Sequence, residues 1–116
     1  MKRPHAKNFV AAVVSWQWRW AQDRWLSKGG TILPYDKLEH FLVYFLAAFL
    51  LSCKLAEKTV IALLFAIGLL WEIKDALMPY EKYGWWGGEG FSWKDLAANI
   101  VGIALGLALR SWIRLD

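Results

Sequence analysis

The sequence predicts an all-α fold: a small integral membrane helical bundle of three transmembrane helices, preceded by an amphipathic interfacial helix. Three observations support it. Of the 116 residues, 58% are hydrophobic, whereas a soluble domain averages about 45–50%. Nine are tryptophans, which gather where a membrane meets water. Three apolar segments, 40–56, 59–78 and 95–113, are separated by polar or Gly- and Pro-containing connections. The length allows one domain.

Cysteine content and charge exclude several classes of protein. The single Cys53 excludes an intramolecular disulfide framework and a cysteine-cluster metal site. The formal charge is +4, but the basic residues lie between apolar segments and form no compact run. We therefore expect membrane lipid or a lipid-linked substrate, and no nucleic acid, as the partner.

Residues 1–30 form a Trp-rich region. Its apolar side chains recur at helical spacing, and polar residues between 17 and 24 count against a central span. This pattern predicts an amphipathic helix lying in the interface. A first transmembrane helix is the alternative.

Residues 31–116 are expected to form the three-helix membrane domain. Asp36 with Glu39 three residues on is a capping-box pattern. Each uninterrupted apolar core has about 13–14 residues, fewer than the roughly 18–20 of a clean span, and the polar ends extend each segment to about 17–20. The Gly-rich aromatic loop 79–94 is either a lid at the membrane surface or a plain interfacial turn.

Polar residues inside the apolar segments come in pairs three or four apart: Asp36 and His40, Glu72 and Asp75, Asp95 and Asn99. This spacing puts each pair on one helix face. If the three segments run antiparallel, all six side chains meet at one side of the membrane. Buried charge in a bilayer is costly and marks function.

The chemistry of these residue types predicts their roles. We expect Glu72, Asp75 and His40 to be catalytic. Imidazole and carboxylates together suit one divalent metal ion, Zn, Mn or Mg, held by His40, Glu72, Asp75 and Asp95. The substrate-binding residues are then Lys37, Lys74, Tyr44, Ser92 and Asn99.

Structural roles compete with each of these assignments. Asp36, Ser92 and Asp95 also suit helix caps. Glu72 can pair with a lysine, and Asn99 suits an interhelical hydrogen bond. The small residues Ala98, Gly102 and Gly106 recur every four residues, which lets another helix approach closely and offers a surface for a homo-oligomer.

The order and spacing of these residues resemble the VanZ-like membrane proteins and the similar YfiM-type small proteins. The resemblance covers about two-thirds of the chain and rests on three motifs: Asp36-Lys37-x-x-His40-x-x-x-Tyr44, Glu72-x-x-Asp75, and Phe91-Ser92-x-x-Asp95-x-x-x-Asn99-x-x-Gly102-x-x-x-Gly106. It implies an integral helical bundle of the bacterial inner (cytoplasmic) membrane, in the cell envelope. The chain differs at Asp75, where many members have Gln, and in its Trp-rich start.

Three functions fit the sequence. The first is a membrane-embedded enzyme that acts on a lipid or polyprenyl-linked headgroup, by hydrolysis or transfer, through the cluster of His and carboxylates at one membrane face. The second is a non-enzymatic lipid- or envelope-binding module. The third is a structural partner subunit. The side of the membrane that the cluster faces stays open, because the basic residues assign it to the cytoplasm only if the N-terminal helix does not cross.

Overall fold

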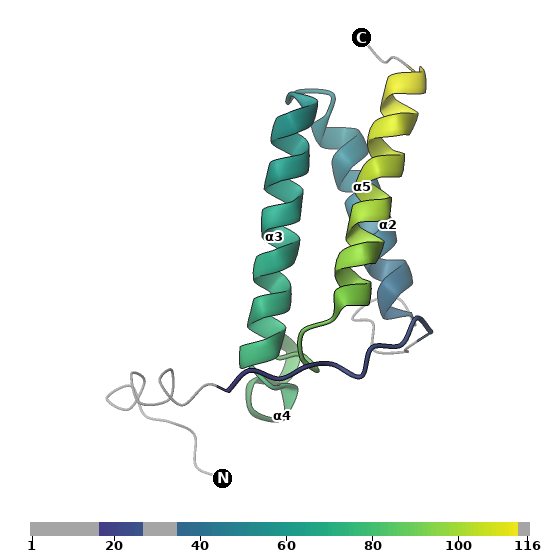
Figure 1. Ribbon diagram of the computed structural model, residues 1–116. Coiled ribbons are helices and arrows are strands. Elements are labelled where there is room, and N and C mark those ends of the chain that lie inside the picture. The colour runs from purple at the N-terminus through teal and green to yellow at the C-terminus, as the bar shows by residue number, and fades with distance from the viewer. Residues whose placement is uncertain (1–16, 27–34, 114–116) are drawn as a thin grey trace, which may run out of the picture.

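The computed structural model describes residues 17–26 and 35–113. Three long helices, α2 (Asp36–Leu51), α3 (Glu57–Leu77) and α5 (Trp93–Ile113), stand side by side (Figure 1). The short α4 (Tyr80–Tyr83) and the 3₁₀ turn η2 (Gly84–Trp86) lie in the connection between α3 and α5. The prediction of an all-α fold is confirmed.

The helix ends follow from local sequence. Ser92 precedes α5, and its Oγ accepts a hydrogen bond from the Asp95 backbone N–H at 3.1 Å, as an N-terminal cap does. Pro79 follows the end of α3, where its ring disfavours further helix. The expected capping box at Asp36 is wrong: Tyr35 occupies the cap position without a side-chain bond. Asp36 is instead the first helical residue, which leaves its carboxylate free to contact other side chains.

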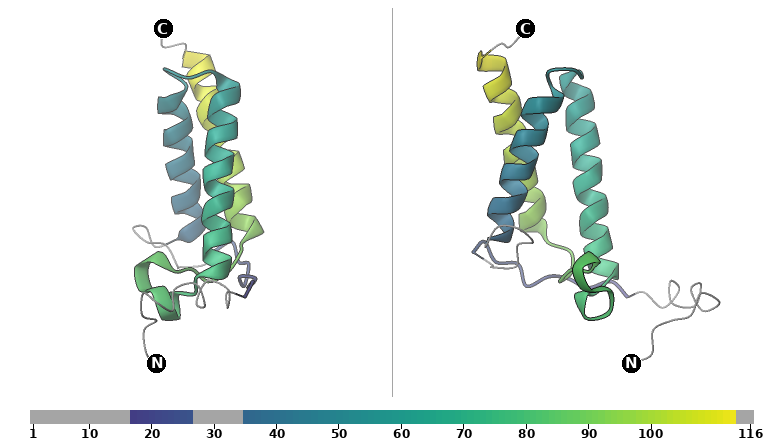
Figure 2. Two further views of the ribbon diagram at one scale, coloured as in Figure 1. Left: turned by 90° about the vertical axis from the view of Figure 1, so that its left-hand side faces the viewer. Right: turned by 180° about the vertical axis from the view of Figure 1, so that it is seen from behind.

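Helices α2 and α5 lie side by side (Figure 2), and they pack closely because α5 presents glycine to α2. A Cβ added at Gly102 would lie 2.5 Å from the Phe41 carbonyl oxygen, and one at Gly106 would lie 2.5 Å from that of Phe45. The expected stripe of small residues therefore serves contact within one chain. Assembly into a homo-oligomer stays a prediction.

The core has two parts. The larger cluster lies between the three helices and contains Tyr44, Ala48, Val60, Leu64, Ile103 and Leu107. The smaller one lies where α3 ends and α5 begins and contains Ala76, Phe91 and Leu96. Of the predicted polar cluster, Glu72, Asp75, Asp95 and Asn99 are buried, and Asp36 and His40 are partly buried.

The prediction of three transmembrane helices is wrong. Among the described residues, α5 alone is long and apolar enough to cross a membrane. Helix α2 has 16 residues, which is about 24 Å of helix and shorter than a bilayer core. Helix α3 carries Glu72, Lys74 and Asp75 close to its C-terminal end, so its apolar stretch is too short.

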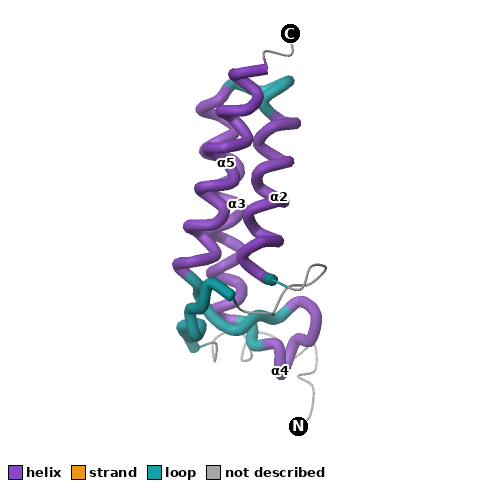
Figure 3. The backbone as a smooth tube through the Cα atoms, turned by 90° about the vertical axis from the view of Figure 1, so that its right-hand side faces the viewer, coloured by secondary structure: helices purple, strands orange, loops and turns teal. Residues whose placement is uncertain are grey.

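Residues 17–26 are not helical, so the expected amphipathic helix is absent from this segment; the rest of that prediction, 1–16 and 27–30, lies outside the described residues. The segment is extended and crosses the end of the bundle at which α3 ends and α5 begins (Figure 1), and Figure 3 shows loops gathered at this end, opposite the C-terminus. The Arg19 N–H donates to the Ala76 carbonyl at 3.1 Å, and the Ala21 N–H donates to that of Phe91 at 3.0 Å. Gly90, at φ 118°, lets the two backbones approach, because a Cβ there would lie 2.6 Å from the Ala21 nitrogen. The N-terminal segment thus closes the polar end of the bundle.

Candidate functional site

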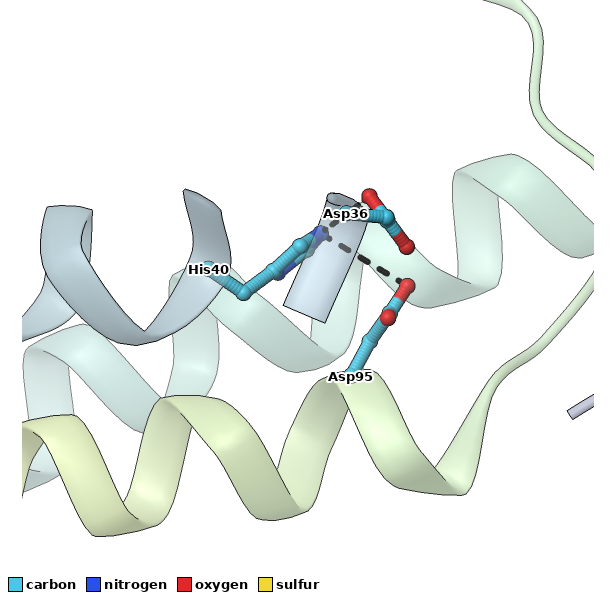
Figure 4. Close-up of side chains that lie close together, drawn as sticks. All are labelled: Asp36, His40 and Asp95. Carbon is cyan, nitrogen blue, oxygen red and sulfur yellow. Dashed lines mark ion pairs between the residues drawn. The ribbon is translucent and has the colours of Figure 1, made fainter. Parts of the chain in front are cut away.

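The polar ends of α2 and α5 bring Asp36, His40 and Asp95 together (Figure 4). His40 Nε2 lies 3.3 Å from Asp36 Oδ1 and 3.5 Å from Asp95 Oδ2. One ligand atom from each residue lies within 4.8 Å of the other two. Asp95 is buried and the other two are partly buried. This triad could hold a metal ion.

Asn99 orients the imidazole of His40. The Asn99 Oδ1 lies 2.9 Å from His40 Nδ1 and accepts a hydrogen bond from the Nδ1–H, which leaves Nε2 to face the two carboxylates. A hydrogen bond on the second ring nitrogen is the usual companion of a metal-binding histidine, because it fixes the tautomer and the ring. Gly68 of α3 makes room for the amide, since a Cβ there would lie 2.7 Å from Asn99 Nδ2.

Lys37 holds the remaining oxygen of each carboxylate. Its Nζ lies 2.9 Å from Asp95 Oδ1 and 3.3 Å from Asp36 Oδ2, whereas the oxygens Asp95 Oδ2 and Asp36 Oδ1 face His40. The lysine therefore orients both carboxylates without contacting the two oxygens that face His40. Lys37 is itself buried, so this ion pairing occurs out of bulk water.

The electrostatics of the triad favour a charged imidazole. Burial lowers the pKa of His40, but the hydrogen bond with Asp36 and the charges of Asp95 and Asp36 outweigh it and raise the pKa to about 9. Burial acts to raise the pKa of Asp36, yet the contacts with His40 hold it well below its usual range. With His40 protonated, two cations balance the carboxylates of Asp36 and Asp95, so a bound metal ion would have to displace the His40 proton.

Glu72 lies outside the triad. Its side chain is fully buried, and Oε1 accepts the Ser92 backbone N–H at 3.0 Å, which ties α3 to the start of α5. Within the described structure its Oε2 has no hydrogen-bond partner. Burial and the nearby charges of Asp95 and Asp75 raise the pKa of Glu72 to about 9, so it is a neutral acid near pH 7. Of the four expected metal ligands the triad contains His40 and Asp95, with Asp36 in place of Glu72 and Asp75.

Asp75 and Lys74 form a separate pair. Lys74 Nζ lies 2.5 Å from Asp75 Oδ1, donates to the Trp86 carbonyl at 2.6 Å, and sits 3.7 Å from the centre of the Trp71 ring. Lys74 was expected to bind a substrate anion, but the structure engages its ammonium with groups of the same chain.

A cavity of about 400 Å³ opens beside the triad. Its walls are formed by the polar end of α2, the adjacent ends of α3 and α5, the connection between α3 and α5, and the N-terminal segment. All three triad residues line it, together with the expected substrate residues Lys37, Tyr44 and Ser92. The lining includes Asp75 but not Glu72, Lys74 or Asn99.

No pattern in the sequence indicates that the N-terminal segment closes this site. Asp23 Oδ1 accepts the Ser92 hydroxyl at 2.5 Å, and Asp23 Oδ2 accepts the Lys94 N–H at 3.1 Å. The Arg19 guanidinium donates to the Gly88 carbonyl at 2.8 Å. Polar residues of an expected surface helix carry no pattern that would reveal these contacts.

No protein-family model, curated protein or solved structure matches the chain. The resemblance to the VanZ-like proteins therefore stays a prediction, and the function has to be argued from the site.

Proposed function

We propose that the protein is a membrane-embedded, metal-dependent hydrolase that acts on a lipid-linked headgroup. The observation that carries the proposal is the Asp36–His40–Asp95 triad at the edge of a 400 Å³ cavity, at one end of a bundle whose outer surface is apolar.

The outer surface of the bundle supports a place in the membrane. Only 39% of the apolar window of α5 is buried within the protein. Its terminal tryptophans, Trp93 and Trp112, are exposed and lie about 28 Å apart along the helix axis, close to the thickness of a bilayer core. Large apolar side chains are exposed on the other helices too, among them Leu46 and Leu50 on α2 and Phe65, Ile67 and Leu70 on α3. We infer that α5 crosses the bacterial inner membrane.

The triad fits a metal ion by its distances and by its donors. Ligand atoms about 2.0–2.1 Å from a tetrahedral centre are about 3.3–3.4 Å apart. The two distances from His40 Nε2 to the carboxylate oxygens are 3.3 and 3.5 Å. One imidazole and two carboxylates favour Zn²⁺ or Mn²⁺, whereas Mg²⁺ prefers oxygen alone. Three protein ligands leave a coordination position open to the cavity, as in catalytic sites.

This arrangement suits hydrolysis of a phosphate ester. A bound divalent ion lowers the pKa of its water and polarises a phosphoryl oxygen. In the reaction a water oxygen forms a bond to phosphorus, the bond from phosphorus to the leaving alcohol breaks, and a proton passes to that alcohol. Lys37 holds the two carboxylates in place, and Asn99 keeps the His40 Nε2 directed at the metal position between them.

A non-enzymatic lipid-binding module is the second candidate. The observation that favours it is the charge balance of the metal-free cluster, in which Lys37 and a protonated His40 neutralise Asp36 and Asp95. Such a cluster needs no metal to be stable. It predicts saturable headgroup binding without a product.

The test is turnover of defined phospholipids by the full chain in detergent micelles. Protein freed of metal and then supplied with Zn²⁺ or Mn²⁺ should release a headgroup product that mass spectrometry identifies. His40→Ala and Asp95→Asn should abolish the product.

Glu57→Gln serves as the control, since Glu57 begins α3 at the end of the bundle remote from the triad, and it should keep full activity. Headgroup binding without product, with either ion, would overturn the enzymatic proposal in favour of the binding module.

A further inference from the structure

The cavity beside the triad is rich in negative charge. Within the part of the chain that the structure describes, five carboxylates line it: those of Asp36, Glu39, Asp75, Glu89 and Asp95. Two of the described side chains in the lining are basic, Lys37 and His40. Lys37 and His40 contact Asp36 and Asp95, and Lys74 contacts Asp75, so no ion pair among the described residues involves Glu89. A confined space with this charge attracts cations.

The lysines expected to bind an anion are directed elsewhere. Lys37 contacts Asp36 and Asp95, and Lys74 contacts Asp75 and the Trp86 carbonyl. Neither ammonium group is arranged to receive a phosphate. The cavity wall away from the triad therefore suits the positive part of a ligand.

Aromatic rings supply the second feature of a cation site. Trp71, Tyr80 and Trp85 line the same cavity, and ring faces attract ammonium groups. The Lys74 ammonium already lies over one of these rings, that of Trp71. The Lys74 Nζ lies 3.7 Å from the centre of the Trp71 ring while a carboxylate and a carbonyl oxygen contact it at 2.5 and 2.6 Å.

We propose that the cavity binds the ammonium end of a zwitterionic phospholipid headgroup of the phosphoethanolamine type. Glu89 and the rings of Trp85 and Tyr80 receive the ammonium. The phosphate then lies toward the triad. The placement of the phosphate rests on the proposed function. Recognition of the ammonium does not depend on it. A volume of about 400 Å³ is within the usual range for sites that enclose small ligands.

Binding to the full chain in maltoside micelles tests the ligand class. Metal is first removed by a chelator, which keeps turnover out of the measurement, and tryptophan fluorescence reports binding. The probes are dihexanoyl phosphatidylethanolamine, dihexanoyl phosphatidylglycerol and free ethanolamine. The two lipids share their acyl chains and phosphodiester, so they differ in the ammonium, whereas ethanolamine separates a soluble amine from a lipid headgroup.

We expect phosphatidylethanolamine to bind at least tenfold more tightly than either other probe. Equal or tighter binding of phosphatidylglycerol would overturn recognition of the ammonium. Equal binding of ethanolamine would overturn assignment to a lipid headgroup.

Two variants locate the ammonium within the cavity. Glu89→Gln and Trp85→Leu should each weaken binding of phosphatidylethanolamine by about threefold to tenfold. Both side chains are exposed, so the substitutions leave the core intact. The matched controls are Glu57→Gln and Trp112→Leu at the other end of the bundle, which should leave the affinity unchanged. An unchanged affinity in both cavity variants would contradict the proposed position.

The metal content of the same variants separates this inference from the proposed function. Glu89→Gln and Trp85→Leu should retain the metal stoichiometry of the wild type, because neither belongs to the triad. Preference for ammonium without metal binding would leave the inference standing and refute the hydrolase. Metal binding and turnover without a preference for the ammonium would refute the inference and leave the hydrolase standing.

Discussion

Replacing Gly102 by alanine tests whether close contact between α2 and α5 holds the site together. The new Cβ would lie 2.5 Å from the Phe41 carbonyl oxygen and 3.0 Å from the Phe45 nitrogen. Both are main-chain atoms of α2 and cannot rotate away. Relief of the clash requires the two helices to separate by several tenths of an ångström near His40.

The cost follows from two opposing effects. Overpacking of a closely packed contact costs about 1–3 kcal/mol, and contact with rigid backbone places this substitution in the upper part of that range. Alanine recovers about 1 kcal/mol relative to glycine inside a helix. We expect a net loss of about 2 kcal/mol, which lowers the unfolding midpoint of a chain of this size by about 8 °C.

Thermal unfolding in detergent, followed by circular dichroism, measures the effect. Ala104→Leu is the control, because Ala104 lies on the exposed face of the same helix and should change the midpoint little. An unchanged or raised midpoint for Gly102→Ala would refute the argument that α2 and α5 meet backbone to backbone at this position.

Three further predictions concern the site and its closure. In metal-free protein the folded-state pKa of His40 and of Glu72, about 9 for each, lies above the ordinary values of 6.5 and 4.5. The folded state therefore binds more protons than the unfolded state between each ordinary value and about 9, so stability falls as pH rises toward 9. Melting curves should show a shallower fall for His40→Gln, and for Glu72→Gln a shallower fall with higher stability near pH 8. Asn99→Ala removes the partner of His40 Nδ1 and should weaken metal binding by about tenfold to a hundredfold in competition with a chelating dye, and unaltered affinity would count against an orienting role. Asp23→Ala removes the carboxylate that contacts Ser92 and Lys94, and should speed proteolysis within residues 17–26 without lowering the melting temperature of the helices; equal protection would show that these contacts do not hold the segment.

Helical spacing was sufficient to predict much of the site. Asp36 and His40 lie one turn apart on α2, as do Asp95 and Asn99 on α5, so the sequence places each pair on one face. The antiparallel order of the segments then brings the two faces to the same end of the bundle. This is why His40, Asp95 and Asn99 were expected together and are found in contact.

Other features depend on tertiary structure. The rotation of each helix about its own axis decides which carboxylate lies beside His40, that of Asp36, Glu72 or Asp75. The periodicity of a sequence does not determine how neighbouring helices are rotated relative to one another. Glu72 instead contacts the backbone of Ser92. The number of membrane spans was overestimated because polar ends were counted toward the length of α2 and α3. The N-terminal segment was missed because backbone pairing such as that of Ala21 with Phe91 leaves no signature in side-chain spacing.

The most direct test of the central claim is elemental analysis of the purified protein after incubation with Zn²⁺ or Mn²⁺ and removal of free ion. The account predicts one metal ion per chain in the wild type and in Glu57→Gln, and a loss of that ion in His40→Ala and Asp95→Asn, with the helical content of each variant checked by circular dichroism. No bound metal in the wild type, or equal metal in a correctly folded His40→Ala, would contradict the assignment of Asp36, His40 and Asp95 as a metal site.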